Sequence, residues 1–172
     1  MASVRVFCIV AGVLLFQAEV SQGSPFTELI RGAIEVNNEA LQQFRGAPRT
    51  GVFCLMEANR NLNPLTEDRH GKLSYLRQAL HFQLQALQIT HSYCKYRHKD
   101  GDICIIAPSN VAVGMARIVL AVRDTLDDQK KKREIEKLLL DRPSRIPSSD
   151  TTLFEKDMIH IGEEVSKMIS KN

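Results

Sequence analysis

The sequence predicts an all-α fold: a compact bundle of four main helices plus one short helix, preceded by a signal peptide. Three observations support this prediction. Apolar residues recur at three- and four-residue intervals in several segments of the 172-residue chain, which is the repeat of an amphipathic helix. Strand signals are nearly absent, and DICIIAP, residues 102–108, is the one candidate. An apolar run also opens the chain, but it is too short to cross a bilayer as a helix.

The first 23 residues predict a secretory signal peptide. Arg5 supplies a positive charge ahead of an unbroken apolar run over residues 6–16, whose length suits the core of a signal peptide. Small residues follow, and we expect cleavage after Gly23, give or take a few residues. Residues 24–172 would then form a single domain that is secreted to the extracellular space. The alternative is a leader that is retained as a membrane anchor.

The first helix is expected over residues 24–45. Ser24 can cap this helix, and Pro25 suits its first position. A stretch rich in Gly and Pro ends it, and residues 50–64 (TGVFCLMEANRNLNP) then predict a short helix or turn. The apolar face of the first helix would comprise Leu29, Ala33, Val36, Ala40 and Phe44.

Residues 73–96 carry the strongest helical periodicity of the chain. One stripe consists of Leu73, Leu76, Leu80, Leu84, Leu87, His91 and Cys94. A second, adjacent stripe consists of Tyr75, Ala79, Phe82, Ala86, Ile89 and Tyr93. Two neighbouring stripes make a wide apolar face, so we expect this helix to pack on several neighbours. A buried core helix explains the pattern better than a cofactor-binding face does.

A long helix should follow, capped by Ser109 or Asn110. Its middle, DDQKKKRE, is wholly polar, and a break near Asp128 is an alternative to one continuous helix. The apolar spacing resumes after this segment. The apolar residues of the whole region are Val111, Met115, Ile118, Val122, Leu126, Ile135, Leu138 and Leu139.

The C-terminal part of the domain predicts a linker and a last helix. DRPSRIPSSD, residues 141–150, has the Pro and Ser content of a linker. Thr152 and Glu155 have the spacing of a capping box at the start of the last helix. The apolar face of this helix would comprise Phe154, Met158, Ile161, Val165 and Met168.

The cysteines predict one disulfide. Cys8 leaves with the signal peptide, so Cys54, Cys94 and Cys104 remain: one pair, and one thiol that is free or bonded to a second chain. The connectivity of the helices brings all three toward the same end of the bundle. Cys94–Cys104 is the favoured pair, while Cys54–Cys104 and Cys54–Cys94 stay open. A disulfide-linked dimer through the remaining thiol is a further alternative.

A zinc site is the alternative use of the same segment. His91, Cys94, His98 and Cys104 offer two imidazoles and two thiolates, but their spacing matches no standard zinc-finger pattern. A disulfide competes for the thiols in an oxidising compartment. We therefore expect no metal here, and we expect no cofactor elsewhere.

Two basic segments are the candidate partner-binding residues. The first, between Cys94 and Cys104, contains Lys95, Arg97, His98 and Lys99. A constrained turn lowers the entropic cost of a receptor or glycan contact, whereas a solvated turn is the simpler interpretation. The second segment is interpreted as a solvated helix face, with a polyanion-binding patch or proteolytic cleavage at its end as alternatives. It comprises Lys130, Lys131, Lys132 and Arg133.

The motifs and the charge argue against several function classes. The chain has no GxSxG, HExxH or P-loop sequence, so we expect no enzyme activity. Its net charge of +3 comes from 23 basic and 20 acidic residues, a mixture that does not indicate nucleic-acid binding. We expect a secreted cytokine-like or hormone-like ligand that acts through an extracellular or cell-surface protein. The alternatives are a carrier of small apolar ligands between helices and a secreted reproductive, salivary or effector protein.

Overall fold

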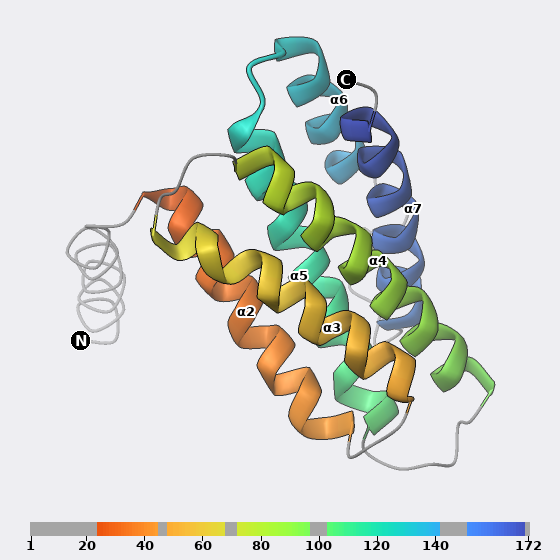
Figure 1. Ribbon diagram of the computed structural model, residues 1–172. Helices are drawn as coiled ribbons and strands as arrows, with labels where there is room; N and C mark the ends of the chain where they lie inside the picture. Colours follow the sequence, from red (N-terminus) through yellow and green to blue (C-terminus); the bar gives the residue numbers. More distant parts are fainter. Residues whose placement is uncertain (1–23, 45–47, 68–71, 97–102, 142–150, 171–172) are drawn as a thin grey trace, which may run out of the picture.

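The structure is a computed structural model that describes residues 24–44, 48–67, 72–96, 103–141 and 151–170 (Figure 1). The described part of the chain is helical and contains no strand, which confirms the predicted fold class. The predicted signal peptide lies outside the described residues. The elements are α2 (Pro25–Phe44), α3 (Arg49–Leu62), a 3-10 helix η1 (Asn63–Glu67), α4 (Lys72–Tyr96), α5 (Ile103–Thr125), α6 (Gln129–Leu140) and α7 (Thr151–Ser170).

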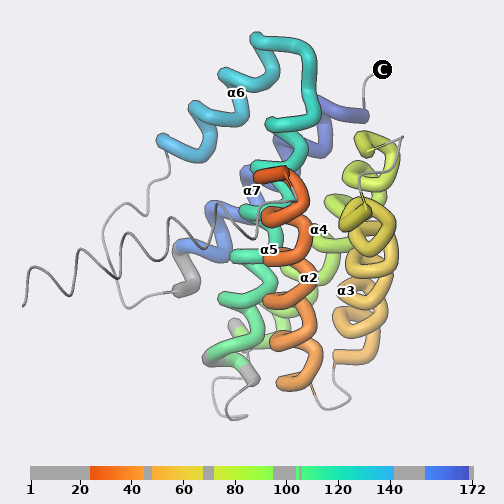
Figure 2. Tube along the Cα trace, turned by 90° about the vertical axis from the view of Figure 1, so that its left-hand side faces the viewer, coloured from red at the N-terminus to blue at the C-terminus, as the bar shows by residue number. Residues whose placement is uncertain are grey.

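α5 is the central helix of the bundle. α2 and α4 pack along it, and α7 packs against both α4 and α5. α3 lies against α4 and also contacts α2. Figure 2 shows α6 extending away from the other helices at one end of the bundle, where it contacts α5 and α7. The core therefore surrounds α5, and α3 and α6 lie at the periphery.

The described residues form six α-helices, so the predicted count of four main helices and one short helix is approximate. Residues 50–64 form most of a full 14-residue helix and the start of η1 rather than a short helix or turn. The predicted long helix is two helices, because Asp128 starts a new one. Its side chain accepts hydrogen bonds from the backbone N–H groups of Lys130 and Lys131, which is an N-cap.

The start of α5 differs from the prediction. The helix begins at Ile103, so neither Ser109 nor Asn110 caps it, and the predicted strand candidate is helical from that residue onward. Pro108 lies inside the helix, where it lacks the N–H of the helical hydrogen-bond ladder. Burial of Ala107 and Pro108 and the disulfide at Cys104 hold this first part of the helix in the bundle.

The two predicted caps have different outcomes. Ser24 caps α2, since its Oγ accepts a hydrogen bond from the N–H of Thr27 at 3.3 Å. α7 begins at Thr151, and the side chain of Thr152 lies outside the described part of the chain, so the predicted capping box stays a prediction. Glu155, the second residue of that box, is buried and contacts His91 on α4.

The apolar stripes form the core largely as predicted. Leu76, Leu80 and Leu87 of α4 are fully buried, and α5 and α7 contribute Met115 and Met158. The buried face of α2 is rotated slightly from the predicted one. Ile30 and Asn37 are buried on α2, whereas the predicted Leu29 and Val36 are half-buried.

One segment of the described chain, Ile106–Thr125 in α5, is long and apolar enough to cross a membrane by length and composition. More than half of this segment is buried inside the bundle, where α2, α4, α6 and α7 surround α5. The core helix of a soluble protein has the same length and composition. The segment therefore carries little weight as evidence for a membrane span.

A network of side-chain amides lies within this apolar core. Asn37 on α2 and Gln83 on α4 pair reciprocally: the Asn37 amide donates to Gln83 Oε1 at 2.8 Å, and the Gln83 amide donates to Asn37 Oδ1 at 2.9 Å. Asn37 also donates to Asn59 on α3, and Gln83 donates to the carbonyl of Val111 on α5. The network joins four helices. No buried side-chain N or O atom in the described part of the chain lacks a partner.

Gly114 on α5 provides the space for this network. A Cβ atom at Gly114 would lie 2.6 Å from Asn37 Oδ1 and 2.7 Å from Gln83 Nε2. These two side-chain atoms are buried and hydrogen-bonded to each other, so neither can move without breaking that hydrogen bond. The absence of a side chain at this position lets α5 approach α2 and α4 closely.

Gly114→Ala should therefore lower the free energy of unfolding by roughly 1–3 kcal/mol, as overpacking in a core does. The loss is expected although alanine favours a helix over glycine by about 1 kcal/mol. Gly51→Ala is the matched control. A Cβ atom at Gly51 would lie 3.3 Å from the nearest side-chain atoms, which belong to Ile89 and Pro48. Denaturant melts of both variants test the prediction, and equal stability of the two would contradict it.

Candidate functional site

The first basic segment is only partly within the described residues. Lys95 belongs to the last turn of α4. Arg97, His98 and Lys99 lie outside the described residues. Their role in partner binding therefore stays a prediction.

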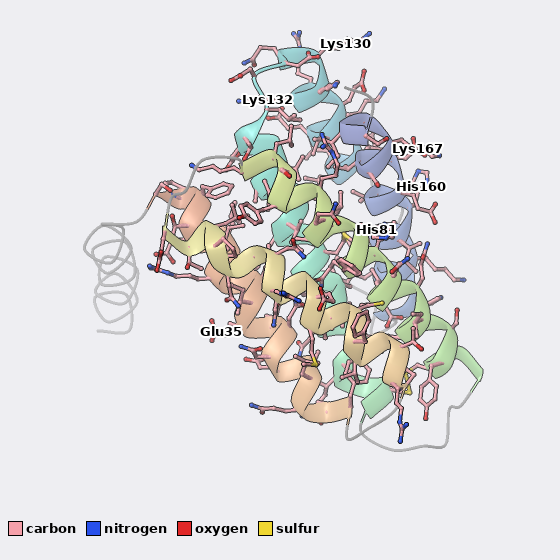
Figure 3. The ribbon with its side chains drawn as sticks, in the orientation of Figure 1. Glu35, His81, Lys130, Lys132, His160 and Lys167 are labelled. Carbon is pink, nitrogen blue, oxygen red and sulfur yellow. A yellow bond between two sulfur atoms is a disulfide. The ribbon has the colours of Figure 1, made fainter. Side chains whose placement is uncertain are left out.

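The second basic segment forms the start of α6. Lys130 and Arg133 are exposed, while Lys131 and Lys132 are partly buried. Consecutive residues of a helix point in directions about 100° apart, and Figure 3 shows Lys130 and Lys132 on different sides of α6. The four side chains therefore do not form a single basic face, and Arg133, the predicted cleavage point, lies within a helix.

The Cys94–Cys104 disulfide is present, which confirms the favoured pair. It joins the last turn of α4 to the first turn of α5, with the two Cα atoms 5.2 Å apart. Closing a loop of this length stabilises a fold by roughly 3 kcal/mol in the chain-entropy model. Because both sulfur atoms are used, the zinc alternative loses its two thiolate ligands. Among the described residues, no group of three or more His, Cys, Asp or Glu side chains could hold a metal ion.

His91 takes part in a buried interhelix contact instead. Its Nδ1 lies 3.1 Å from Glu155 Oε2 on α7. The two side chains are 12% and 4% exposed, so the contact is shielded from solvent. His91 is nearly one turn from Cys94, and the end of α4 is thus tied to α5 by the disulfide and to α7 by this pair. The disulfide and this pair therefore fix the end of α4 within the bundle.

A groove lies between α6 and α7. Its volume is about 460 Å³. Leu138 of α6 and Ile161 and Met168 of α7 supply its apolar lining. The polar residues around them are Glu134, Lys137, Asp141, Asp157, His160 and Glu164. Sequence reasoning missed the groove, although these residues recur at helical spacing on each helix.

α3 carries a second surface feature, an apolar pair that no other helix of the described chain covers. Phe53 and Met56 are 58% and 56% exposed. Arg49 and Arg60 are also exposed and lie four residues before and four residues after the pair. These spacings place all four side chains along one face of the helix. We call this surface, formed by Arg49, Phe53, Met56 and Arg60, the α3 stripe.

Comparisons with known proteins give no relative from which a function could be transferred. No protein family model matches the chain, and neither a curated protein nor a solved structure is significantly similar to it. The function must therefore be argued from the surfaces described above.

Cys54 is free and buried on α3 against α4. Its Sγ lies 3.6 Å from Gln85 Oε1, to which the thiol can donate. Burial raises the pKa of the Cys54 thiol, so the neutral, unreactive form is favoured at neutral pH. The expected reactive or intermolecular thiol at this position is therefore disfavoured. A disulfide-linked dimer would require Cys54 to leave its packed position.

Cys54 in the folded protein should accordingly react with a maleimide at least about tenfold more slowly than in denaturant, because only the exposed thiolate reacts rapidly. Mass spectrometry of timed samples, kept non-reducing to preserve Cys94–Cys104, measures the two rates. Labelling of the folded protein at the denatured rate would show that Cys54 is accessible.

Proposed function

We propose that this chain is a secreted, non-enzymatic helical protein that acts as a cytokine-like or hormone-like ligand for an extracellular or cell-surface protein. The observation that carries this proposal is the α3 stripe. Phe53 and Met56 remain exposed on a well-packed helix, where a folded protein gains nothing from them. Aromatic residues, Met and Arg are enriched in protein interfaces.

The construction of α3 suits it to binding. The opposite side of the helix is fixed to α4 through fully buried Leu55, Ala58 and Leu62. A stripe on such a rigid element loses little conformational entropy when a partner binds. Its apolar centre and its two arginines would complement an apolar pocket with an acidic rim on the partner. Arg60 also forms an ion pair with Glu57 at 3.6 Å. This ion pair is weak, because the Arg60 side chain is exposed to solvent.

The packing of α4 does not favour the alternative of a carrier that encloses its ligand against this helix. Leu76, Leu80 and Leu87 of its wide apolar face are fully buried by side chains of neighbouring helices. The buried amides near them are hydrogen-bonded to each other. A ligand there would have to displace core side chains and leave amides unpaired, which costs about 1–3 kcal/mol for each group.

Secretion can be tested independently of binding. The full chain, expressed in eukaryotic cells, should accumulate in the medium with its N-terminus near Ser24, because residues 1–23 have the composition of a cleavable signal peptide. N-terminal sequencing of the protein from the medium measures this. An intact Met1 in the membrane fraction would instead assign these residues to an anchor.

Replacing Phe53 and Met56 together by serine should weaken saturable binding to partner-bearing cells of the source organism by tenfold or more. Buried interface anchors contribute at least about 1–2 kcal/mol each, and 1.4 kcal/mol is a tenfold change. The fluorescently labelled mature protein is titrated onto the cells, with unlabelled protein as competitor. Circular dichroism melts should be unchanged, because both side chains are exposed.

Leu140→Ser is the matched control for this experiment. Leu140 is 64% exposed on α6, so the substitution removes a comparable apolar side chain from a different surface. The control should bind like the natural protein. If the α3 variant binds normally while Leu140→Ser is impaired, the α3 stripe is not the interface.

A further inference from the structure

The connection between α5 and α6 is a short hinge between two helices that the sequence predicts as one long helix. α5 ends at Thr125 and α6 begins at Gln129, so Leu126, Asp127 and Asp128 separate them. We propose that this hinge straightens into a continuous helix, and that two copies of the chain then exchange α6 and α7 to form a dimer. Such an exchange does not depend on the function proposed above.

The residues of the hinge do not themselves break a helix. No Gly or Pro occurs between residues 115 and 140, on either side of the hinge. A continuous helix would bring opposite charges together at a spacing of four residues, in the pairs Arg123–Asp127, Asp127–Lys131 and Asp128–Lys132. Such pairs stabilise a helix, while one like-charged pair, Asp124 with Asp128, would oppose them. The break is therefore not imposed by a helix-breaking sequence.

The closed hinge depends on one cap. The N–H of Leu126 still donates to the carbonyl of Val122 at 3.2 Å, which continues the hydrogen-bond ladder of α5 into the hinge. Straightening would extend this ladder through residues 127–131. The Asp128 side chain would then lose its two hydrogen bonds from the N–H groups of the first turn of α6. The Asp128 cap is thus the hydrogen-bonded feature that favours the closed hinge.

The exchange would preserve the contacts of the core. α6 is lightly held, because Ile135 is its one fully buried side chain. α7 packs on α4 and α5, where Met158 and Val165 are fully buried. In the dimer, α7 of each copy would make these same contacts with α4 and α5 of the other copy. Monomer and dimer would therefore differ in few interactions apart from the hinge, which is why domain swapping costs little free energy.

A second copy is the occupant that completes the straightened form. Figure 2 shows α6 turning back from the end of α5. Straightening would instead carry the 12 residues of α6 outward, over about 18 Å at 1.5 Å per residue. Ile135 and the half-buried Leu138 would then leave α5 of their own chain. A second copy that has undergone the same change offers the equivalent face of its α5, so each copy covers the apolar residues of the other.

The rest of each copy would stay as it is in the monomer. The Cys94–Cys104 disulfide joins α4 to α5, and the amide network of Asn37 and Gln83 joins helices from α2 to α5. None of these contacts crosses the hinge. Because α3 lies in the part that does not exchange, each dimer would carry two copies of the α3 stripe.

Refolding from denaturant tests for the dimer. The mature protein, with its disulfide kept oxidised, is refolded at low and at high protein concentration, and light scattering after size exclusion measures the dimer fraction. We expect a dimer after refolding at high concentration, and we expect it to persist on dilution, because α7 must leave the bundle before the copies separate. Monomer alone at every concentration, for both the natural protein and Asp128→Ala, would overturn the proposal.

Two substitutions should shift the hinge in opposite directions. Asp128→Ala removes the cap of the closed hinge and should lower the apparent dissociation constant of the dimer about tenfold or more, since each of the two copies loses a cap. Gln129→Pro should leave no detectable dimer, because proline suits the first position of α6 but cannot continue the ladder of α5. The backbone of Asp128, with φ −72° and ψ 106°, is extended and accepts a following proline.

Gln129→Ala is the matched control, because it changes the same exposed side chain without restricting the backbone. It should form the dimer like the natural protein. Circular dichroism melts of both variants at position 129 establish that they are folded. Equal dimer formation by Gln129→Pro and Gln129→Ala would show that the dimer does not use a straightened hinge, and this result would overturn the proposal.

Isotope-filtered NOE spectra distinguish exchange from association through an outer surface. Gly162 of α7 lies against α5, since a Cβ atom at Gly162 would be 3.0 Å from Met115 Cε. In dimers refolded from an equal mixture of labelled and unlabelled chains, exchange predicts NOEs between Gly162 of one chain and Met115 of the other. A dimer in which this contact occurs only within one chain would overturn the exchange of α7.

Discussion

The reciprocal amide pair between Asn37 and Gln83 is the interaction on which the packing of the bundle depends. Apolar stripes hold helices together, but they tolerate small shifts, because many apolar contacts are interchangeable. Buried amides do not, since each unpaired group costs about 1–3 kcal/mol. Asn37, Gln83, Asn59 and the carbonyl of Val111 satisfy one another only when α2, α3, α4 and α5 have this register. Gly114 allows the helices to come close enough.

Further polar contacts extend this fixed register to the ends of the helices. Arg117 of α5 donates to the carbonyl of Gly32 on α2 at 2.7 Å, and Arg77 of α4 donates to the carbonyl of Ile169 on α7 at 2.9 Å. The disulfide and the His91–Glu155 pair secure the other end of α4. The outer surfaces therefore sit on a framework whose helices have little freedom to move. α6 is the exception, because Ile135 is its one fully buried side chain.

The two candidate surfaces have opposite chemistry and different supports. The α3 stripe is convex and apolar with arginines at its ends, and α4 holds it in place. The α6–α7 groove is concave with acidic walls, and one of its walls is the least anchored helix. The proposed protein partner would use the first surface. The two surfaces share no residue.

The sequence by itself determined the fold class and the core helix over residues 73–96, because periodicity is a local property of the chain. It favoured the Cys94–Cys104 disulfide but left two other pairings open, because a cysteine count does not fix which thiols meet. It offered the break near Asp128 only as an alternative to one long helix, and the structure shows that the break occurs. Only the tertiary structure showed that Asn37 and Gln83 meet, that Glu155 contacts His91, and that Cys54 is buried. The groove and the α3 stripe likewise depend on which helix faces remain uncovered. That choice is made by contacts between residues far apart in the chain, which helical spacing alone does not specify.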